Sequence, residues 1–367
     1  MSASADCSGA ENGLFFFGGY DPTYPRNSII RKGWERCGFP VSECRVDTRL
    51  KVPVRYPALL WRHAHMKDSS RIIFVPDFRH KDVPLAWLIA RCTGRKIIFD
   101  PLVSRYETRV LDRGDVRRGS VQAWHNRNLD RVSMKLPDLV LADTAAHARF
   151  FSDEFSVSIR KIRVLPLGFD ESVFHESPLP PARASCSVLF YGSYLPLHGV
   201  DTIVDAAGFL RDAPVCFTLV GDGQTLAAAK ARAVGSALRN ITFRPPAPEP
   251  ELQDLIEAAD IVLGVFGTTP KAGLVVPNKV YQGLAVGRPV VTGDTPAMRE
   301  FFENGVHLGT VPPGDARALA RAIGSLAQDR ATRERLARTG GAYVRAEFNS
   351  KRIAERLLGI LTGERFL

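Results

Sequence analysis

The residues best suited to chemistry lie in one stretch, Pro270 to Glu300, which reads PKAGLVVPNKVYQGLAVGRPVVTGDTPAMRE. Two of its lysines, Lys271 and Lys279, flank a Pro-Asn helix start signal. The first backbone amides of a helix, together with ammonium groups, form a site for an anion such as a phosphate. The alternative is that both lysines are solvated surface charges.

The elements that must position these lysines can be read from the same stretch. It predicts a helix from Lys279 to Val286 that ends at Gly287, then a buried strand over 289–292 and a second helix start at Thr295. In a doubly wound α/β sheet, such a helix start lies at the carboxyl edge, where ligands bind. We therefore expect the anion site at that edge.

Short apolar runs alternate with helical patterns along the whole chain. Strands are predicted at 14–19, 41–46, 71–76, 96–100, 139–143 and 162–167, and, after a proline-rich linker at 175–185, at 187–192, 216–221, 240–244, 261–266 and 289–292. Buried strands separated by helices indicate parallel sheets covered on both faces. The pattern predicts an α/β fold of two Rossmann-like, doubly wound domains facing a cleft, over 1–176 and 177–345, with a final helix at 346–367 that returns to the first domain.

Polar and glycine residues end several of the predicted strands. Gly18 and Gly19 follow the first strand, where they form a tight turn or let a ligand approach the backbone, and Arg26 comes shortly after. Asp100 ends another strand and is a candidate site residue, with a purely structural role as the alternative. Asp143, followed by Thr144, is more simply explained as part of an Asp143-Thr144 helix cap.

Charge limits the class of partner. The 367 residues carry a formal charge of +10, of which +7 lies in residues 1–176 and +3 in the remainder. The excess favours an anionic partner for the first half, either a phosphorylated or lipid-linked substrate or an anionic membrane surface. The candidate residues for contacting this anionic partner are Arg105, Arg109, Arg113, Arg117 and Arg118. The alternative, equally compatible with the sequence, is that these arginines form a solvated basic face. No nucleic-acid motif accompanies the charge, so no nucleic acid is expected.

Cysteine usage and hydropathy bear on the compartment. The six cysteines form no CxxC pair and no metal-type cluster with histidine, so we expect reduced thiols and no bound metal or cofactor. The first thirteen residues do not read as a signal peptide, and no apolar run approaches the length of a membrane span. The expected location is the cytoplasm, with peripheral contact at the inner face of the membrane as an option.

Four motifs occur in a recognisable order: GSYLPLHGVDTIVDAA from Gly192, LVGDG from Leu219, ADIVL from Ala259 and PNKVYQGLAVGRPVV from Pro277. Together they resemble the C-terminal motifs of bacterial group 1, retaining nucleotide-sugar glycosyltransferases of the GT-B fold, in the branch with a Pro-Asn-Lys motif. The likeness is strongest over 187–310.

The resemblance implies a nucleotide-sugar donor site in the second domain and an acceptor site in the first. The implied donor-binding residues are Gly192, Ser193, His198, Gly221, Asp222, Gly223, Arg244, Pro245, Pro277, Asn278 and Gln282; the acceptor-binding candidates are Gly18, Gly19 and Arg26; and the catalytic candidates are Lys271, Lys279 and Asp100.

The chain departs from the family's usual pattern at its phosphate and ribose positions. An arginine and a lysine that neutralise phosphate are replaced by Ser193 or Tyr194 and by His198, and two glutamates are replaced by Leu274 and Gln282. Lys271 and Lys279 would supply the missing charge.

The hypothesis is a metal-independent, retaining transferase. The alternatives are a sugar-nucleotide-binding protein without catalysis, a sugar-nucleotide epimerase or hydrolase on the same fold, and an interaction scaffold without nucleotide affinity.

Overall fold

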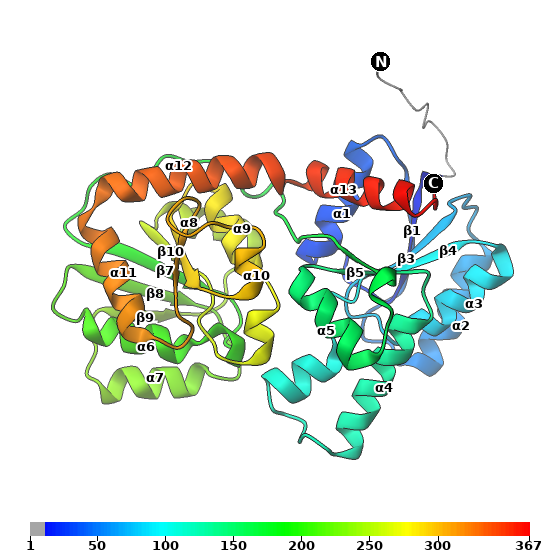
Figure 1. Ribbon diagram of the computed structural model, residues 1–367, viewed down its shortest axis with the longest axis horizontal. Helices are drawn as coiled ribbons and strands as arrows, with labels where there is room; N and C mark the ends of the chain where they lie inside the picture. Colours follow the sequence, from blue (N-terminus) through cyan, green and yellow to red (C-terminus); the bar gives the residue numbers. More distant parts are fainter. Residues whose placement is uncertain (1–11) are drawn as a thin grey trace. The chain divides into compact units, whose positions relative to one another are not determined.

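The computed structural model describes residues 12–367 (Figure 1). The predictions made for Cys7 and for the absence of a signal peptide concern residues outside this range. The chain divides into two compact units. The first takes the described residues up to Thr108, Val116–Leu167 and Asn349–Leu367, and the second takes Arg109–Asp115 and Gly168–Phe348. Residues 175–185, expected as a linker, thus lie within the second unit.

The first unit is built on one parallel sheet. Its strands in the described residues are β1 (Leu14–Gly18), β2 (Val41–Arg45), β3 (Ile72–Val75), β4 (Lys96–Phe99), β5 (Leu139–Ala142) and β6 (Ile162–Val164), in the spatial order β2-β1-β3-β4-β5-β6. The apolar strands β1 and β3 are fully buried because helices cover both faces of the sheet.

Six α-helices of the described chain belong to this unit: α1 (Pro25–Arg36), α2 (Val52–Ala64), α3 (Val83–Thr93), α4 (Val121–Lys135), α5 (Ala145–Phe155) and α13 (Ser350–Gly363). The last of them comes from the end of the chain and packs along α1 (Figure 1). This packing needs a glycine, because a Cβ built on Gly33 would lie 2.1 Å from the carbonyl oxygen of Ser350.

The second unit repeats the architecture. Its described strands are β7 (Cys186–Tyr191), β8 (Val215–Val220), β9 (Ile241–Arg244), β10 (Ile261–Leu263), β11 (Val290–Gly293) and β12 (Gly309–Val311), in the parallel order β12-β11-β10-β7-β8-β9. Its α-helices are α6 (Val200–Phe209), α7 (Leu226–Gly235), α8 (Glu249–Glu257), α9 (Asn278–Ala285), α10 (Pro296–Arg299), α11 (Ala316–Gln328) and α12 (Arg330–Glu347). The predicted fold class, two doubly wound parallel α/β sheets, is confirmed.

Helix boundaries and one whole helix differ from the predictions. Helix α1 begins at Pro25 after Tyr24, and the side-chain amide of Asn27, within its first turn, donates to the carbonyl of Asp21. The final helix was predicted from residue 346, but two helices meet there: α12 ends at Glu347 and α13 begins at Ser350. They separate at Asn349, whose side chain accepts a hydrogen bond from the amide of Arg352 and caps α13. Helix α2 was not among the elements predicted.

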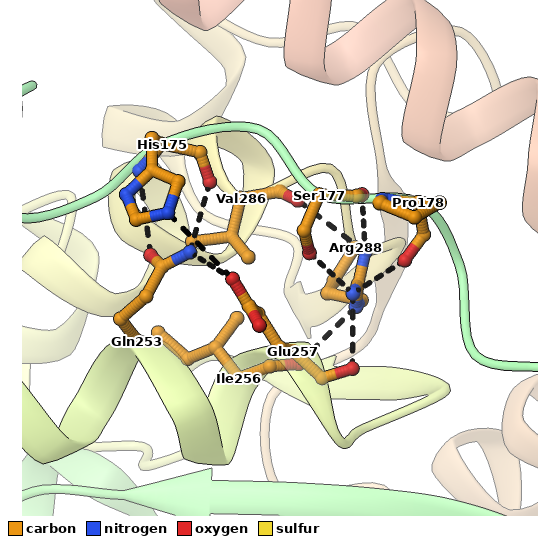
Figure 2. A network of polar contacts seen from close by, with 8 residues as sticks. All are labelled: His175, Ser177, Pro178, Gln253, Ile256, Glu257, Val286 and Arg288. Atoms are coloured by element: carbon orange, nitrogen blue, oxygen red, sulfur yellow. Dashed lines mark hydrogen bonds and ion pairs between the residues drawn. The ribbon is translucent and has the colours of Figure 1, made fainter.

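Within the second unit, the side chain of Arg288 connects the segment at Ser177 and Pro178 to helix α8 (Figure 2). Its buried guanidinium donates to the carbonyl of Pro178 at 2.8 Å and to the hydroxyl and carbonyl oxygens of Ser177 at 2.7 and 3.0 Å. The same group donates to the carbonyls of Ile256 and Glu257 at the end of α8. One side chain thereby fixes the expected linker against helix α8.

Candidate donor and acceptor sites

The strand order of the second unit places a crevice next to β7. Chain order runs outward from β7 through β8 to β9 on one side, and from β10 through β11 to β12 on the other. Open α/β sheets bind ligands outside the carboxyl ends of the strands at such a reversal. The loop that begins at Gly192 follows β7, and Lys271 and Lys279 follow β10.

The glycines of this edge are required first by packing between loops. A Cβ built on Gly221 would lie 1.9 Å from the carbonyl oxygen of Gly192, and one on Gly223 would lie 2.7 Å from the amide of Tyr194. Both glycines also have positive φ, at 139° and 148°. The carbonyl of Asp222 accepts a hydrogen bond from the amide of Tyr194, which joins the two loops. Their close contact explains the glycines without a ligand.

Lys279 is a buried cation at this edge. Only 5% of the residue is exposed, and its ammonium nitrogen has no hydrogen-bond partner. The nitrogen lies 4.1 Å from the centre of the Phe190 ring and 3.1 Å from the position a Cβ would take on Gly192. Burial lowers the pKa of Lys279 to about 7. The cation–π contact offsets only part of the cost of burying this charge.

The charges of Lys279 and Lys271 both act on the imidazole of His198. Burial, then the charge of Lys279 and a smaller contribution from Lys271, hold the pKa of His198 well below its ordinary value. The imidazole is therefore neutral, and its Nδ1 donates to the carbonyl of Ser193. The positive charge near Gly192 comes from the lysines instead.

Gln282 is held by a residue that the sequence analysis missed. The hydroxyl of Tyr191, the last residue of β7, donates to Oε1 of Gln282 at 2.9 Å. Burial keeps the pKa of Tyr191 well above its ordinary value, so the hydroxyl remains a donor. A carbonyl oxygen has two lone pairs, and one of those on Gln282 can accept a further hydrogen bond. The clue in the sequence was that Tyr191 directly precedes Gly192.

A cavity of about 240 Å³ opens at the ends of β7 and β8. It is lined by Tyr191, Gly192, Ser193, Val220, Gly221, Asp222, Pro246, Ala247 and Leu252. Four of these residues were expected in the donor site, whereas Arg244 and Pro245 are exposed at the end of β9 and do not line it. The apolar wall from Val220, Pro246 and Leu252 suits a flat ring.

Pro277 and Asn278 form the start of helix α9. Pro277 is the N-cap residue and makes no side-chain capping hydrogen bond, and Asn278 is the first helical residue. Lys279 is the second residue of α9, so the buried ammonium group belongs to the first turn of this helix.

The first unit brings Arg26 and Asp100 together. The Nε of Arg26 lies 2.7 Å from Oδ2 of Asp100, and both residues are 1% exposed. A second guanidinium nitrogen of Arg26 donates to the carbonyl of Pro166, while Nη2 has no partner. Asp77 lies close to this pair, and burial, with the charge of Asp100, raises the pKa of Asp77 to about 7.

Gly18 and Gly19 form a turn held by Asp82. The amide of Gly19 donates to Oδ2 of Asp82 at 2.9 Å, and Arg55 of helix α2 pairs with Oδ1 of the same carboxylate at 2.7 Å. Gly18 has a φ of 139°, which favours glycine. The turn is therefore held in place by the hydrogen bond to Asp82, whose carboxylate is in turn fixed by Arg55.

The helix cap expected at Asp143-Thr144 is made by Thr144 alone. Thr144 caps α5 by accepting from the amide of His147, and Asp143 instead lies 2.6 Å from Nδ1 of that histidine. Glu107 lies 3.0 Å from the other ring nitrogen. Burial alone would lower the pKa of His147, but Glu107 and Asp143 outweigh it and raise that pKa to about 9.

The described residues hold neither a metal-type cluster nor a membrane-spanning helix. Within residues 12–367, no group of three or more histidine, cysteine and acidic side chains is arranged to hold a metal ion. In the same range, no helix combines the length and the apolar character needed to cross a membrane.

Comparison with known proteins identifies the second unit. Residues 185–329 match the family model described as "Glycosyl transferases group 1". The chain is 26% identical over 208 residues to the amylovoran biosynthesis glycosyltransferase AmsK of Erwinia amylovora, covering 55% of this chain and 50% of that protein. It is 27% identical over 246 residues to a D-inositol 3-phosphate glycosyltransferase of Thermobispora bispora, covering 61% and 56%. The chain thus spans about half the length of these curated relatives.

Solved structures share the whole fold. Anabaena Alr3699/HepE in complex with UDP and glucose superposes with a TM-score of 0.74 at 15% identity, covering 96% of this chain and 100% of that one. The sucrose-phosphate synthase of Thermosynechococcus elongatus gives 0.73 at 16% identity, covering 97% and 99%. The motifs, the family match and the shared fold agree: the second unit matches the group 1 glycosyl transferases over residues 185–329, and the chain has the GT-B fold of these solved structures.

Proposed function

We propose that this protein transfers a sugar from a nucleoside diphosphate sugar to an acceptor. The observation that carries the proposal is the ammonium group of Lys279, buried without a hydrogen-bond partner beside Gly192 at the carboxyl edge of the second sheet. A buried, unpaired cation costs the fold free energy. A diphosphate at this edge would give that charge its counterion.

The proposed donor site follows the edge of the sheet. The cavity next to Tyr191 takes the base, with Arg244 and Pro245 at its margin, and Gln282 accepts a hydrogen bond from the ribose. The loops at Gly192, Ser193 and Gly221–Gly223 approach the diphosphate, together with the α9 start at Pro277 and Asn278. HepE was solved with UDP and with UDP-glucose, which makes uridine the first nucleotide to test.

The proposed reaction breaks the bond between the anomeric carbon and the diphosphate oxygen and forms one to an acceptor oxygen on the same face of the sugar. The acceptor's proton leaves on the diphosphate. Negative charge grows on the leaving group, and preorganised cations stabilise it most effectively where water is excluded. We assign this role to Lys271 and Lys279, with no requirement for a divalent metal, and neutral His198 lines the site.

The first unit is proposed to bind the acceptor. Asp100 is its catalytic candidate, fixed by the ion pair with Arg26, and Gly18 and Gly19 lie at the same sheet edge. The charge of +7 on residues 1–176 favours a lipid-linked acceptor at an anionic membrane surface. We propose peripheral association with the cytoplasmic face of that membrane.

The experiment is to follow a sugar nucleotide by NMR with the full chain and a lipid-linked acceptor preparation, in the presence of EDTA. Transfer predicts donor loss that depends on acceptor and a product that keeps the donor's anomeric configuration. Donor consumed without acceptor would instead indicate a hydrolase or epimerase, and donor bound but never consumed would indicate a binding protein.

A further inference from the structure

Helix α2 of the first unit presents an uncharged, apolar face to solvent. Apart from Arg62, six of its residues are exposed: Pro53, Val54, Pro57, Leu60, Trp61 and Ala64. At 100° per residue they fall within one arc of about 120° that contains no polar side chain. Val54 is 59% exposed, Leu60 45% and Trp61 65%. A contiguous apolar surface of this kind marks an interaction site.

The opposite face of α2 accounts for its attachment to the fold. Leu59 is fully buried, and its carbonyl accepts from the thiol of Cys44. The ring of His63 lies 5.6 Å from that of Phe15 in β1, and Arg55 pairs with Asp82. The inner face of α2 thus makes the contacts that hold the helix on the sheet. The exposed apolar face is not needed for this packing.

The charges around the exposed face are mostly positive. From Thr48 to Lys67 the sequence holds no acidic residue, while Arg49, Lys51, Arg62 and Lys67 are exposed. The nearest carboxylates along the chain are Asp47, which is exposed and accepts from the amide of Arg49, and Asp68, which pairs with Arg95 at 2.7 Å. An apolar arc flanked mainly by cations, with a tryptophan on it, matches the headgroup boundary of an anionic bilayer.

A second exposed tryptophan in the same unit provides a contrast. Trp124 of α4 is 66% exposed, and Val121 nearby is 83% exposed. Polar residues interrupt that face, with His125 and Asn128 close to Val121 on the helix wheel. A second copy of this chain is a poor occupant for α2, because a two-fold contact would bring the flanking cations against their own copies.

We propose that the exposed face of helix α2, with its flanking cations, docks the protein onto an anionic lipid membrane. Arg55 and Asp82 link the helix to the Gly18–Gly19 turn through one ion pair and one hydrogen bond, so docking holds the acceptor-side turn near the lipid surface. The lipid-linked acceptor rests on the proposed function. The docking itself needs no sugar nucleotide and can be measured without one.

The test is co-sedimentation of the full chain with vesicles of phosphatidylcholine alone and of phosphatidylcholine with an equal amount of phosphatidylglycerol. The expected result is binding to the anionic vesicles that weakens as salt is raised. Trp61→Glu should weaken binding roughly tenfold or more, and Val54→Glu should act in the same direction. Trp124→Glu, the same substitution at an equally exposed site, should change binding far less.

Unfolding midpoints of the variants check that each remains folded. Loss of vesicle binding in Trp124→Glu but not in Trp61→Glu would overturn the assignment to α2. Equal binding to both kinds of vesicle would remove the role of the cations. Absence of vesicle binding, with self-association that Trp61→Glu abolishes, would show that a second copy occupies the face. None of these results depends on donor binding, so the proposed function stands or falls separately.

Discussion

Lys279 is a single residue whose burial destabilises the fold and for which we propose an anionic ligand. Its ammonium group is buried, lacks a hydrogen-bond partner and has a pKa lowered by burial to about 7. Groups that destabilise the free protein while fitting a charged ligand are typical of functional sites.

Replacing Lys279 with methionine should therefore have two opposite effects. The ligand-free protein should unfold at a higher temperature, because a buried charge is removed while the side chain's length is kept. Affinity for the nucleoside diphosphate should fall roughly tenfold to hundredfold, the effect of losing one charge-assisted hydrogen bond. Thermal unfolding and calorimetric titration measure the two effects.

The matched control is Lys230→Met, at an exposed lysine of α7 in the same unit, which should change neither quantity. A variant of Lys279 that lost stability and kept its affinity would mean that the lysine supports the fold and has no part in donor binding.

Donor binding should also depend on pH through Lys279. A diphosphate favours the ammonium form, so affinity should fall as pH rises above about 7, by up to tenfold per unit. His198 does not titrate in this range because its pKa is well below its ordinary value. Titration of a nucleoside diphosphate between pH 6 and 9 measures the slope. The ligand's own ionisation affects the wild-type protein and Lys279→Met equally, so the variant serves as the control. An equal slope in both proteins would argue against a role for the lysine.

At the scale of elements, Arg288 connects the chain at Ser177 and Pro178 to the end of helix α8 (Figure 2). Lysine keeps the charge but cannot reproduce the planar set of donors, so Arg288→Lys leaves buried carbonyls without partners. We expect the unfolding free energy to fall by about 3 kcal/mol or more. Denaturant unfolding measures this loss.

Arg299→Lys is the control for that substitution. Arg299 makes a surface ion pair with Asp294, with 68% of its own side chain exposed, and pairs of this kind contribute little to stability. Equal losses in the two variants would contradict the structural role given to Arg288.

The packing of α13 on α1 can be tested with two glycines. Gly33→Ala should destabilise the first unit, because its Cβ would lie 2.1 Å from the Ser350 carbonyl. Gly359→Ala, within α13 and with no atom near its Cβ position, should stabilise by about 0.5–1 kcal/mol through helix propensity. Thermal unfolding distinguishes the two signs. A neutral Gly33→Ala would mean that the helices do not pack this closely.

At the scale of the molecule, the sequence predicted most strands and both doubly wound sheets, because each buried strand is a short apolar run between helix signals. It did not predict α2, which contains Pro57 and whose outward face is apolar while its inner face carries Arg55 and His63, the reverse of the usual amphipathic pattern. The exposed face now proposed for docking is the feature that obscured the helix.

The candidate sites were predictable only in part. Motif order placed Gly192, Lys279 and Gln282 in one region, since they follow neighbouring strands. The burial of Lys279 under Phe190 depends on tertiary packing that spacing does not encode. The pairing of Arg26 with Asp100 likewise joins residues 74 positions apart. Tyr191 was missed because a strand-end tyrosine reads as core.

The most direct measurement is the unfolding midpoint of the full chain and of Lys279→Met against a panel of UDP-, GDP-, ADP- and dTDP-sugars. A ligand at about 100 times its dissociation constant stabilises the native state by ~2.7 kcal/mol, a rise of roughly 5 °C. We predict such a rise for one nucleotide family in the wild-type chain and a much smaller one in the variant. No rise with any sugar nucleotide, or an equal rise in both proteins, would contradict a donor site built around Lys279.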